Sequence, residues 1–225
     1  KFIDSFLIGL SYAVCKVLNQ LSDGPCNGRF FSVRKLSKFY NIPIIETFDV
    51  NSEKYLREVE KIKPDLIISI SSPQIFKENL ISLPKVDCLN VHGTLLPKHR
   101  GTHGLWWSLL EEDQFGGVTI HKIVSKIDGG DIAIQKKFSL SSSESRFSLA
   151  YKTNSTIPIA VKDLLNRYSM KTLNFREMDV TNGSYHYAPE IKDVNLFKKK
   201  NLKIINLRDI SNLLNNSLYP FSKKD

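Results

Sequence analysis

Short apolar runs alternate with amphipathic segments between residues 52 and 92, and this alternation constrains the fold more than any other feature. The run Asp65–Ile70 is rich in β-branched residues, as is typical of a strand buried on both faces. Pro64 ends the helical pattern before it, and Asp87–His92 is the next strand-like run. Such alternation predicts βαβ units. The expected fold class is therefore α/β, with a Rossmann-like, mostly parallel sheet and helices on both faces.

The remaining periodicity predicts further elements and a division into two parts. Helices are expected over residues 29–40, 52–62, 103–112 and 144–168, with a short helix ending near residue 83. Strands are expected over residues 41–45, 117–123 and 131–138, with a tight loop before the last one. Periodicity weakens after Tyr168. We therefore expect one main domain over residues 1–170 and a short C-terminal extension over residues 171–225.

Composition restricts the compartment. The chain has no run of about 18 apolar residues, so no membrane span is expected. Phe6–Leu18 comes nearest, but polar residues interrupt it, and we interpret it as an amphipathic or buried helix. Cys15, Cys26 and Cys88 show no metal-binding spacing, and their odd number argues against a full disulfide framework. A reducing, cytoplasmic location is the simplest expectation.

The formal charge of +9 at pH 7 suits an anionic partner, which can be a nucleic acid or a small molecule. The lysines are scattered apart from Lys198–Lys200 and Lys223–Lys224. The sequence contains no zinc finger, no aromatic-glycine RNA-binding signature and no basic helix with heptads. We therefore favour a solvated basic surface over nucleic-acid binding.

Side chains capable of chemistry gather where three segments follow predicted strands. These segments are residues 71–74, the run that begins with Asn90 and His92, and the loop that contains Asp128. In open parallel sheets, ligands bind at the carboxyl ends of the strands. Because Asn90 and His92 are two residues apart, both side chains should point to the same face of a strand. Taken alone, this pair is a weak signal, and two side chains that satisfy backbone groups at a strand end explain it better.

The surrounding residues resemble the signature of the folate-dependent formyltransferase family. Residues 89–101 read Leu-Asn-Val-His-Gly-Thr-Leu-Leu-Pro-Lys-His-Arg-Gly. In the family, Asn-x-His is followed by a small residue, Ser or Thr, Leu-Leu-Pro and Arg-Gly. The family then has Gly-Val-Thr-x-His, Asp-x-Gly and a strand ending in Gln, which match Gly117–His121, Ile127–Gly130 and Asp131–Gln135. The resemblance covers residues 41–140, with both motifs in the family's order and spacing.

The resemblance implies transfer of a formyl group from the co-substrate 10-formyltetrahydrofolate to a primary amine. By position, the family's catalytic residues are Asn90, His92 and Asp128. Asn90 would donate a hydrogen bond to the developing oxyanion, and a protonated His92 would donate another and relay protons. Asp128 would favour the imidazolium form of His92 and fix its orientation.

The resemblance also assigns residues around this centre. The residues expected to bind the cofactor are Pro73, Gln74, Leu96, Ile127 and Gly129. Thr94 and Arg100 are expected on the substrate side, with a packed turn and a structural role as their respective alternatives.

No metal is expected among the cofactors. His99, His103 and His121 are not spaced as metal ligands relative to a cysteine or carboxylate set. We interpret His121 as a satisfied core histidine, and Trp106 and Trp107 as core residues.

The segment after residue 170 guides the choice of acceptor. Tyr185–Pro189 followed by Asp193–Lys200 resembles the tail of formyltransferases with short C-terminal extensions, which often act on amino sugars. The expected acceptor is therefore the amino group of a nucleotide-linked sugar, an anionic small molecule whose diphosphate suits the positive charge. Methionyl-tRNA as acceptor, hydrolysis of 10-formyltetrahydrofolate, and a non-catalytic basic nucleic-acid-binding module are the alternatives. A homodimer is left open.

One departure from the family pattern lies at the N-terminus. Family members begin with a βαβ unit that contains a glycine-bearing turn. Residues 1–28 instead look like a helix and a loop, with turn signals at Gly24-Pro25 and Asn27-Gly28. We therefore expect this βαβ unit to be missing, either because residues are absent from the chain or because the protein is a degenerate relative.

Overall fold

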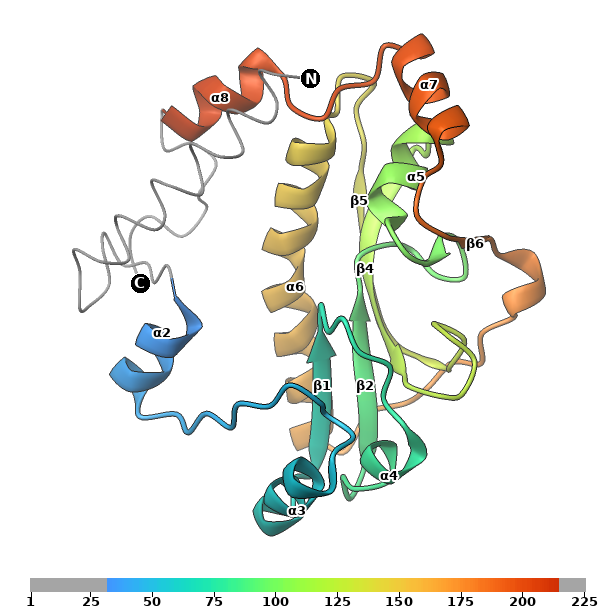
Figure 1. Cartoon of the computed structure of the whole chain (residues 1–225). Coiled ribbons are helices and arrows are strands. Elements are labelled where there is room, and N and C mark those ends of the chain that lie inside the picture. Colours follow the sequence, from blue (N-terminus) through green and yellow to red (C-terminus); the bar gives the residue numbers. More distant parts are fainter. Residues whose placement is uncertain (1–31, 215–225) are drawn as a thin grey trace. The chain divides into compact units, whose positions relative to one another are not determined.

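The structure is a computed structural model and describes residues 32–214 (Figure 1). The helix and turns predicted within residues 1–28 lie outside the described residues. The chain divides into two compact units, which are described separately. One is Asp49–Ser211, and the other combines Lys1–Phe48 with Asn212–Asp225. Within the described residues, no helix has the length and apolar character needed to cross a membrane.

A four-stranded sheet forms the centre of the larger unit (Figure 1). In spatial order, its strands are β1 (Leu66–Ile70), β2 (Asp87–His92), β4 (Phe115–Lys122) and β5 (Ile132–Ser139). β1 and β2 are parallel, whereas β2 pairs with β4, and β4 with β5, in antiparallel fashion. The α/β fold class is confirmed, with a smaller share of parallel pairing than the sequence pattern predicted.

Connection lengths account for the pairing of β1 with β2 and of β4 with β5. The segment between β1 and β2 contains α4 (Glu78–Ile81) and is long enough for the crossover that parallel strands require. Residues 123–131 form too short a connection for a crossover, so β4 and β5 lie antiparallel. β1 is at the edge of the described sheet, and its residues are mostly half-buried rather than buried on both faces as predicted.

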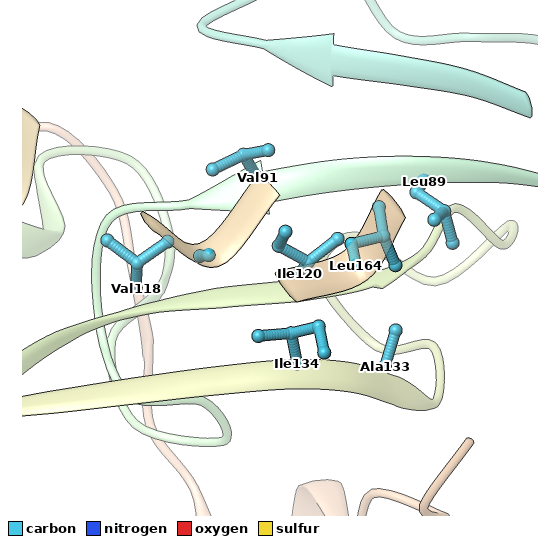
Figure 2. Close-up of a cluster of buried hydrophobic side chains, with 8 residues drawn as sticks. Leu89, Val91, Val118, Ile120, Ala133, Ile134 and Leu164 are labelled. Atoms are coloured by element: carbon cyan, nitrogen blue, oxygen red, sulfur yellow. The ribbon is translucent and has the colours of Figure 1, made fainter. Parts of the chain in front are cut away.

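Side chains of β2, β4 and β5 form the main hydrophobic core, and on β2 and β4 they are alternate residues (Figure 2). They pack against α6 (Arg146–Ser169), which begins with a capping box at Ser145. The buried members are Leu89, Val91, Val118, Ile120, Ala133, Ile134, Ala160 and Leu164. Burying one Leu or Ile side chain contributes about 1.5–3 kcal/mol. Because side chains alternate along a strand, Asn90 and His92 of β2 point away from α6.

The loop after β2 covers the opposite face next to β4 and β5. Thr119 Oγ1 donates a hydrogen bond to Thr94 O at 2.7 Å and lies 3.1 Å from Leu96 N, which donates to it. Gln135 Nε2 donates to Leu96 O at 2.9 Å. Here a hydrogen-bonded loop, rather than a helix, covers the sheet and holds the following residues in place.

Most predicted elements are present at the expected positions. α3 (Glu53–Ile62) begins after Ser52, whose Oγ accepts a hydrogen bond from Tyr55 N, and α5 spans Gly104–Leu110. The strand predicted over residues 41–45 is wrong, because these residues form no strand. In the smaller unit, α2 (Val33–Tyr40) ends at Asn41 in a left-handed conformation, and the apolar residues that follow remain exposed.

Residues 171–211 belong to the same compact unit as the sheet. They form η1 (Val180–Asn182), β6 (Tyr185–His186), α7 (Ile191–Lys199) and the first part of α8 (Leu207–Leu214). β6 pairs in parallel with β3 (Arg100–Gly101), and Phe197 stacks on Trp106 with ring centroids 4.0 Å apart. These contacts join the predicted C-terminal extension to the loop after β2 and to α5.

Candidate active site

A cleft of about 890 Å³ opens where β1 and β2 end. Its walls come from residues 69–78, 90–94, 101–105 and 121–128, and Tyr185 of β6 completes them. The three segments that the sequence singled out therefore meet around one cavity. The sequence did not predict that Tyr185 lines the cleft, because β6 lies far along the chain from the other three segments.

Asn90, His92 and Asp128 converge on one wall of this cleft. Asn90 Nδ2 donates to Asp128 Oδ1 at 3.4 Å, and His92 Nδ1 lies 3.6 Å from Asp128 Oδ2. Asn90 and His92 come from the same face of β2, as predicted, and Asp128 comes from the loop after β4. An amide, an imidazole and a carboxylate thus stand within reach of one bound group.

Backbone and side-chain donors fix the position of Asp128. Gly101 N donates to Asp128 Oδ2 at 2.8 Å, while Asp128 itself adopts a left-handed conformation with φ of 47°. Burial acts to raise the pKa of Asp128, but contacts with His121, His92 and Gly101 outweigh it and hold the pKa below its usual value. Asp128 is therefore an ionised acceptor at neutral pH.

His92 lies between this carboxylate and a backbone carbonyl. Its Nε2 is 2.9 Å from His99 O, and because a carbonyl only accepts, Nε2 carries a hydrogen. Burial lowers the pKa of His92 and outweighs the opposing effect of Asp128. The resting ring is therefore neutral, with Nδ1 unprotonated and directed toward Asp128. Asp128 favours the imidazolium form, as expected, but the cost of burying the charge outweighs this effect.

His121 is a fourth member of this group. It is buried, as predicted, but its Nε2 lies 3.3 Å from Asn90 Nδ2 and 3.5 Å from Asp128 Oδ1. Its Nδ1 is 2.8 Å from Lys122 O, which orients the ring. The sequence did not reveal this role because it depends on the pairing of β2 with β4, where Asn90 lies opposite His121. His121 positions Asn90 and Asp128.

Four further predicted residues line the cleft, namely Pro73, Gln74, Thr94 and Ile127. Gln74 Oε1 accepts a hydrogen bond from Val50 N at 3.0 Å, which ties the loop after β1 to the chain before α3. The Thr94 hydroxyl donates to Lys98 O at 3.2 Å and the side chain is buried. These contacts fit the role in a packed turn that was the alternative to substrate binding for Thr94.

Leu96, Gly129 and Arg100 are not among the residues that line the cleft. Leu96 is buried in a small cluster with Ile132 and Met178. Gly129 lies in a turn where an added Cβ would meet the Lys126 side chain. The Arg100 guanidinium is largely buried and lies 5.7 Å from the centre of the Tyr185 ring. The side chains of Leu96 and Arg100 pack within the protein, and their predicted contacts with folate and acceptor stay predictions.

The sequence matches a known protein family and several characterised relatives. The family described as "Formyl transferase" matches residues 34–164, which is more than half of the chain. This chain belongs to the formyl transferase family. Methionyl-tRNA formyltransferase of Thermotoga maritima is 30% identical over 164 residues, covering 73% of this chain and 52% of that protein. The bifunctional polymyxin resistance protein ArnA of Wigglesworthia glossinidia brevipalpis is 33% identical over 171 residues, covering 72% and 26%.

This member of the formyl transferase family thus spans about half the length of the first relative and a quarter of the second. Solved structures share its fold. A sugar N-formyltransferase from Shewanella sp. is 27% identical, with a TM-score of 0.55 and coverage of 74% of this chain and 65% of that chain. The formyltransferase PseJ from Anoxybacillus kamchatkensis is 23% identical, with a TM-score of 0.57 and coverage of 78% and 87%. PseJ was solved in complex with UDP-4,6-dideoxy-4-formamido-L-AltNAc and tetrahydrofolate.

Proposed function

We propose that this protein transfers the formyl group of 10-formyltetrahydrofolate to a primary amine. The observation that carries the proposal is the convergence of Asn90, His92 and Asp128 on one wall of the 890 Å³ cleft. A cleft of this size is within the range for small-molecule ligands. Membership in the formyl transferase family supports the reaction class.

The first step forms a tetrahedral species. The amine nitrogen attacks the formyl carbon, and the π electrons of the carbonyl move onto its oxygen. Asn90 Nδ2 donates a hydrogen bond to this developing oxyanion, and one such donor typically contributes about 100- to 1,000-fold in rate. The attacking nitrogen loses its proton to the neutral His92 at Nδ1. Asp128, 3.6 Å from Nδ1, stabilises the imidazolium that results.

The second step releases the products. The electron pair on the oxyanion re-forms the carbonyl, and the bond between the formyl carbon and the folate nitrogen breaks. The proton held on His92 passes to the departing folate nitrogen, so that His92 returns to its neutral form. The products are a formamide and tetrahydrofolate, and the balance needs no oxidant, metal or water.

We infer that the amine belongs to a nucleotide-linked amino sugar. The Shewanella sugar N-formyltransferase, at 27% identity, supports this choice. Tyr185 adds an aromatic ring to the cleft wall, and the net charge of +9 suits a diphosphate. The competing acceptor is methionyl-tRNA, because a relative with 30% identity carries that name.

A labelled-transfer experiment tests both parts of the proposal. The full chain is incubated with 10-formyltetrahydrofolate that carries ¹³C in the formyl group and with a panel of acceptors. The panel contains nucleotide-linked amino sugars, glycinamide ribonucleotide and methionyl-tRNA. The expected result is a ¹³C-formyl mass gain on an amino sugar, with tetrahydrofolate released only when an acceptor is present. Preferential formylation of methionyl-tRNA would refute the sugar, and acceptor-independent release of formate would refute the transfer reaction.

A further inference from the structure

A second polar cluster lies outside the cleft. His99, Glu111 and His186 each offer one ligand atom, and these three atoms lie within 4.8 Å of one another. His99 belongs to the loop after β2, Glu111 ends α5, and His186 belongs to β6. The cluster therefore joins two neighbouring segments to β6, which lies far along the chain, and this distance is why sequence spacing gave no metal-binding pattern.

Two of the three distances between these atoms are close to those around a tetrahedral metal ion, and the third is within 4.8 Å. His99 Nδ1 lies 3.3 Å from His186 Nε2, and His186 Nε2 lies 3.2 Å from Glu111 Oε1. Zinc binds imidazole nitrogen and carboxylate oxygen at about 2.0–2.2 Å, so neighbouring ligand atoms in a tetrahedron are about 3.3 Å apart. Two imidazoles and one carboxylate are also a ligand set that zinc commonly takes.

Asp113 determines which nitrogen of His99 is available. Its Oδ2 lies 2.6 Å from His99 Nε2 and accepts a hydrogen bond from Ser108 Oγ at 2.7 Å. Its Oδ1 accepts from Lys98 Nζ at 3.2 Å. Since Asp113 acts as an acceptor throughout, His99 Nε2 carries a hydrogen, and in the neutral ring Nδ1 presents a lone pair toward His186. A carboxylate behind a histidine orients that histidine for a metal ion in many metalloproteins.

His186 is also held in a defined orientation. Its ring stacks on Trp107, with centroids 4.4 Å apart and an angle of 13° between the planes. Ser184 Oγ accepts from His99 N at 2.8 Å and lies 3.1 Å from His186 Nε2, so one hydroxyl bridges the two histidine residues. The ligand atoms are thus preorganised by their neighbours.

We propose that His99, Glu111 and His186 bind a divalent transition-metal ion, for which zinc is the best match. His99 and Glu111, but not His186, line an adjoining pocket of about 390 Å³, and this pocket gives water a path to one side of the cluster. The ion fastens β6 to the loop whose His99 carbonyl oxygen contacts His92. Its role is structural and lies outside the formyl-transfer step, so the site does not depend on the proposed activity.

Metal titration of the full chain tests this site. After removal of metals by a chelator, zinc affinity is measured by competition with a chromophoric chelator, and cobalt is titrated to follow its visible absorption. One equivalent of zinc is expected to bind, and cobalt is expected to show the intense bands of a tetrahedral site. Glu111→Gln and His186→Gln are each expected to weaken zinc binding by at least about tenfold.

Glu112→Gln and His103→Gln are the matched controls, because they remove the same kinds of side chain outside the cluster. Both are expected to keep the zinc affinity of the unsubstituted chain. The proposal is overturned if the unsubstituted chain takes up no zinc, or if the Gln variants at Glu111 and His186 bind as tightly as the controls. The two rings would then be joined by an N–H···N hydrogen bond of the same length. Should His186→Gln fail to fold, Glu111→Gln carries the test, because the Glu111 side chain is 41% exposed.

Discussion

Two of the histidine–carboxylate pairs in the described part of the chain, one at the cleft and one behind it, differ in tightness. His92 Nδ1 and Asp128 Oδ2 are 3.6 Å apart at the cleft, whereas His99 Nε2 and Asp113 Oδ2 are 2.6 Å apart behind it. The two aspartates are equally exposed, at 11% of the side chain. The pairs are connected, because His92 Nε2 contacts the backbone oxygen of His99.

The comparison shows that the partners of each carboxylate, and not its exposure, set its role. Burial acts to raise the pKa of Asp113, but hydrogen bonds from His99 and Ser108 bring the pKa to about 2. That pair is a fixed support for the loop. In the looser pair, the pKa of His92 is lowered by burial and Nδ1 is unprotonated, so the ring has the capacity to take a proton from a substrate.

The largest expected effect separates the two pairs by activity. Asp128→Asn removes the charge that stabilises the His92 imidazolium, and we expect turnover to fall about 100- to 10,000-fold. Asp113→Asn should reduce turnover only a few-fold, because Asp113 acts on His99 rather than on the reacting atoms. Steady-state formyl transfer measured on both variants checks this. If both variants lost the same amount of turnover, the proposed difference between a catalytic pair and a supporting pair would be wrong.

Gly101 connects the two regions, and its replacement should be the most destabilising change. Its φ is 91°, and an added Cβ would lie 2.3 Å from His186 O. Strain and overpacking together should lower the free energy of unfolding of Gly101→Ala by about 2–6 kcal/mol. Gly129→Ala is the matched control, since the three atoms nearest its added Cβ belong to the Lys126 side chain, at 2.9–3.1 Å, and not to the backbone. Chemical denaturation compares them, and equal stability of the two variants would contradict the assigned geometry.

For stability we expect the opposite order to that for activity. Replacing Asp113 should destabilise the protein more than replacing Asp128. Asp113→Asn leaves His99 and Ser108 with weaker acceptors, and we expect a loss of about 1–3 kcal/mol in the free energy of unfolding. Asp128→Asn should cost less, because it also relieves the desolvation of a buried charge. Urea unfolding of both variants measures the difference. A greater loss in Asp128→Asn would show that the looser pair is also a structural support.

The smallest expected effect is a shift in the pH profile. The pKa of His92 lies below its usual 6.5, so the neutral, proton-accepting form persists as the pH falls through 6.5 and is lost only at lower pH. The ratio kcat/KM should therefore show an acid limb with an apparent pKa below 6.5. Asp113→Asn should keep the same limb. If activity instead rises as the pH falls through this range, His92 acts as an imidazolium acid and the proposed direction of proton transfer is reversed.

Local patterns in the sequence were sufficient for most of the fold. The run 87–92 forms β2 at its predicted bounds, and α3 begins at one of the two predicted caps, because strand alternation and helix capping are local properties. The strand predicted over residues 41–45 failed because an apolar run forms a strand only where another strand pairs with it. The antiparallel pairing of β2 with β4 was not predicted either, because the hydrophobic periodicity of a strand does not show which other strand it pairs with.

In the site, too, local sequence patterns predicted nearby residues but not contacts between distant segments. Asn90 and His92 were placed together by their spacing, and Asp128 by the family resemblance, and the structure brings all three to one wall. His121 and Tyr185 join the cleft through strand pairing and through a distant segment. The net effect on His92 could not be predicted either, because the cost of burying a charge depends on the surrounding atoms and not on the nearest carboxylate alone.

The most direct test of the central claim is the replacement Asn90→Ala, studied with separate measurements of folate binding and turnover. If Asn90 donates to the oxyanion, its removal acts on the transition state and leaves the bound co-substrate largely unaffected. The expected result is tetrahydrofolate affinity within a few-fold of the unsubstituted protein and turnover reduced by about 100- to 1,000-fold. Turnover that stays within a few-fold of the unsubstituted protein would contradict the account.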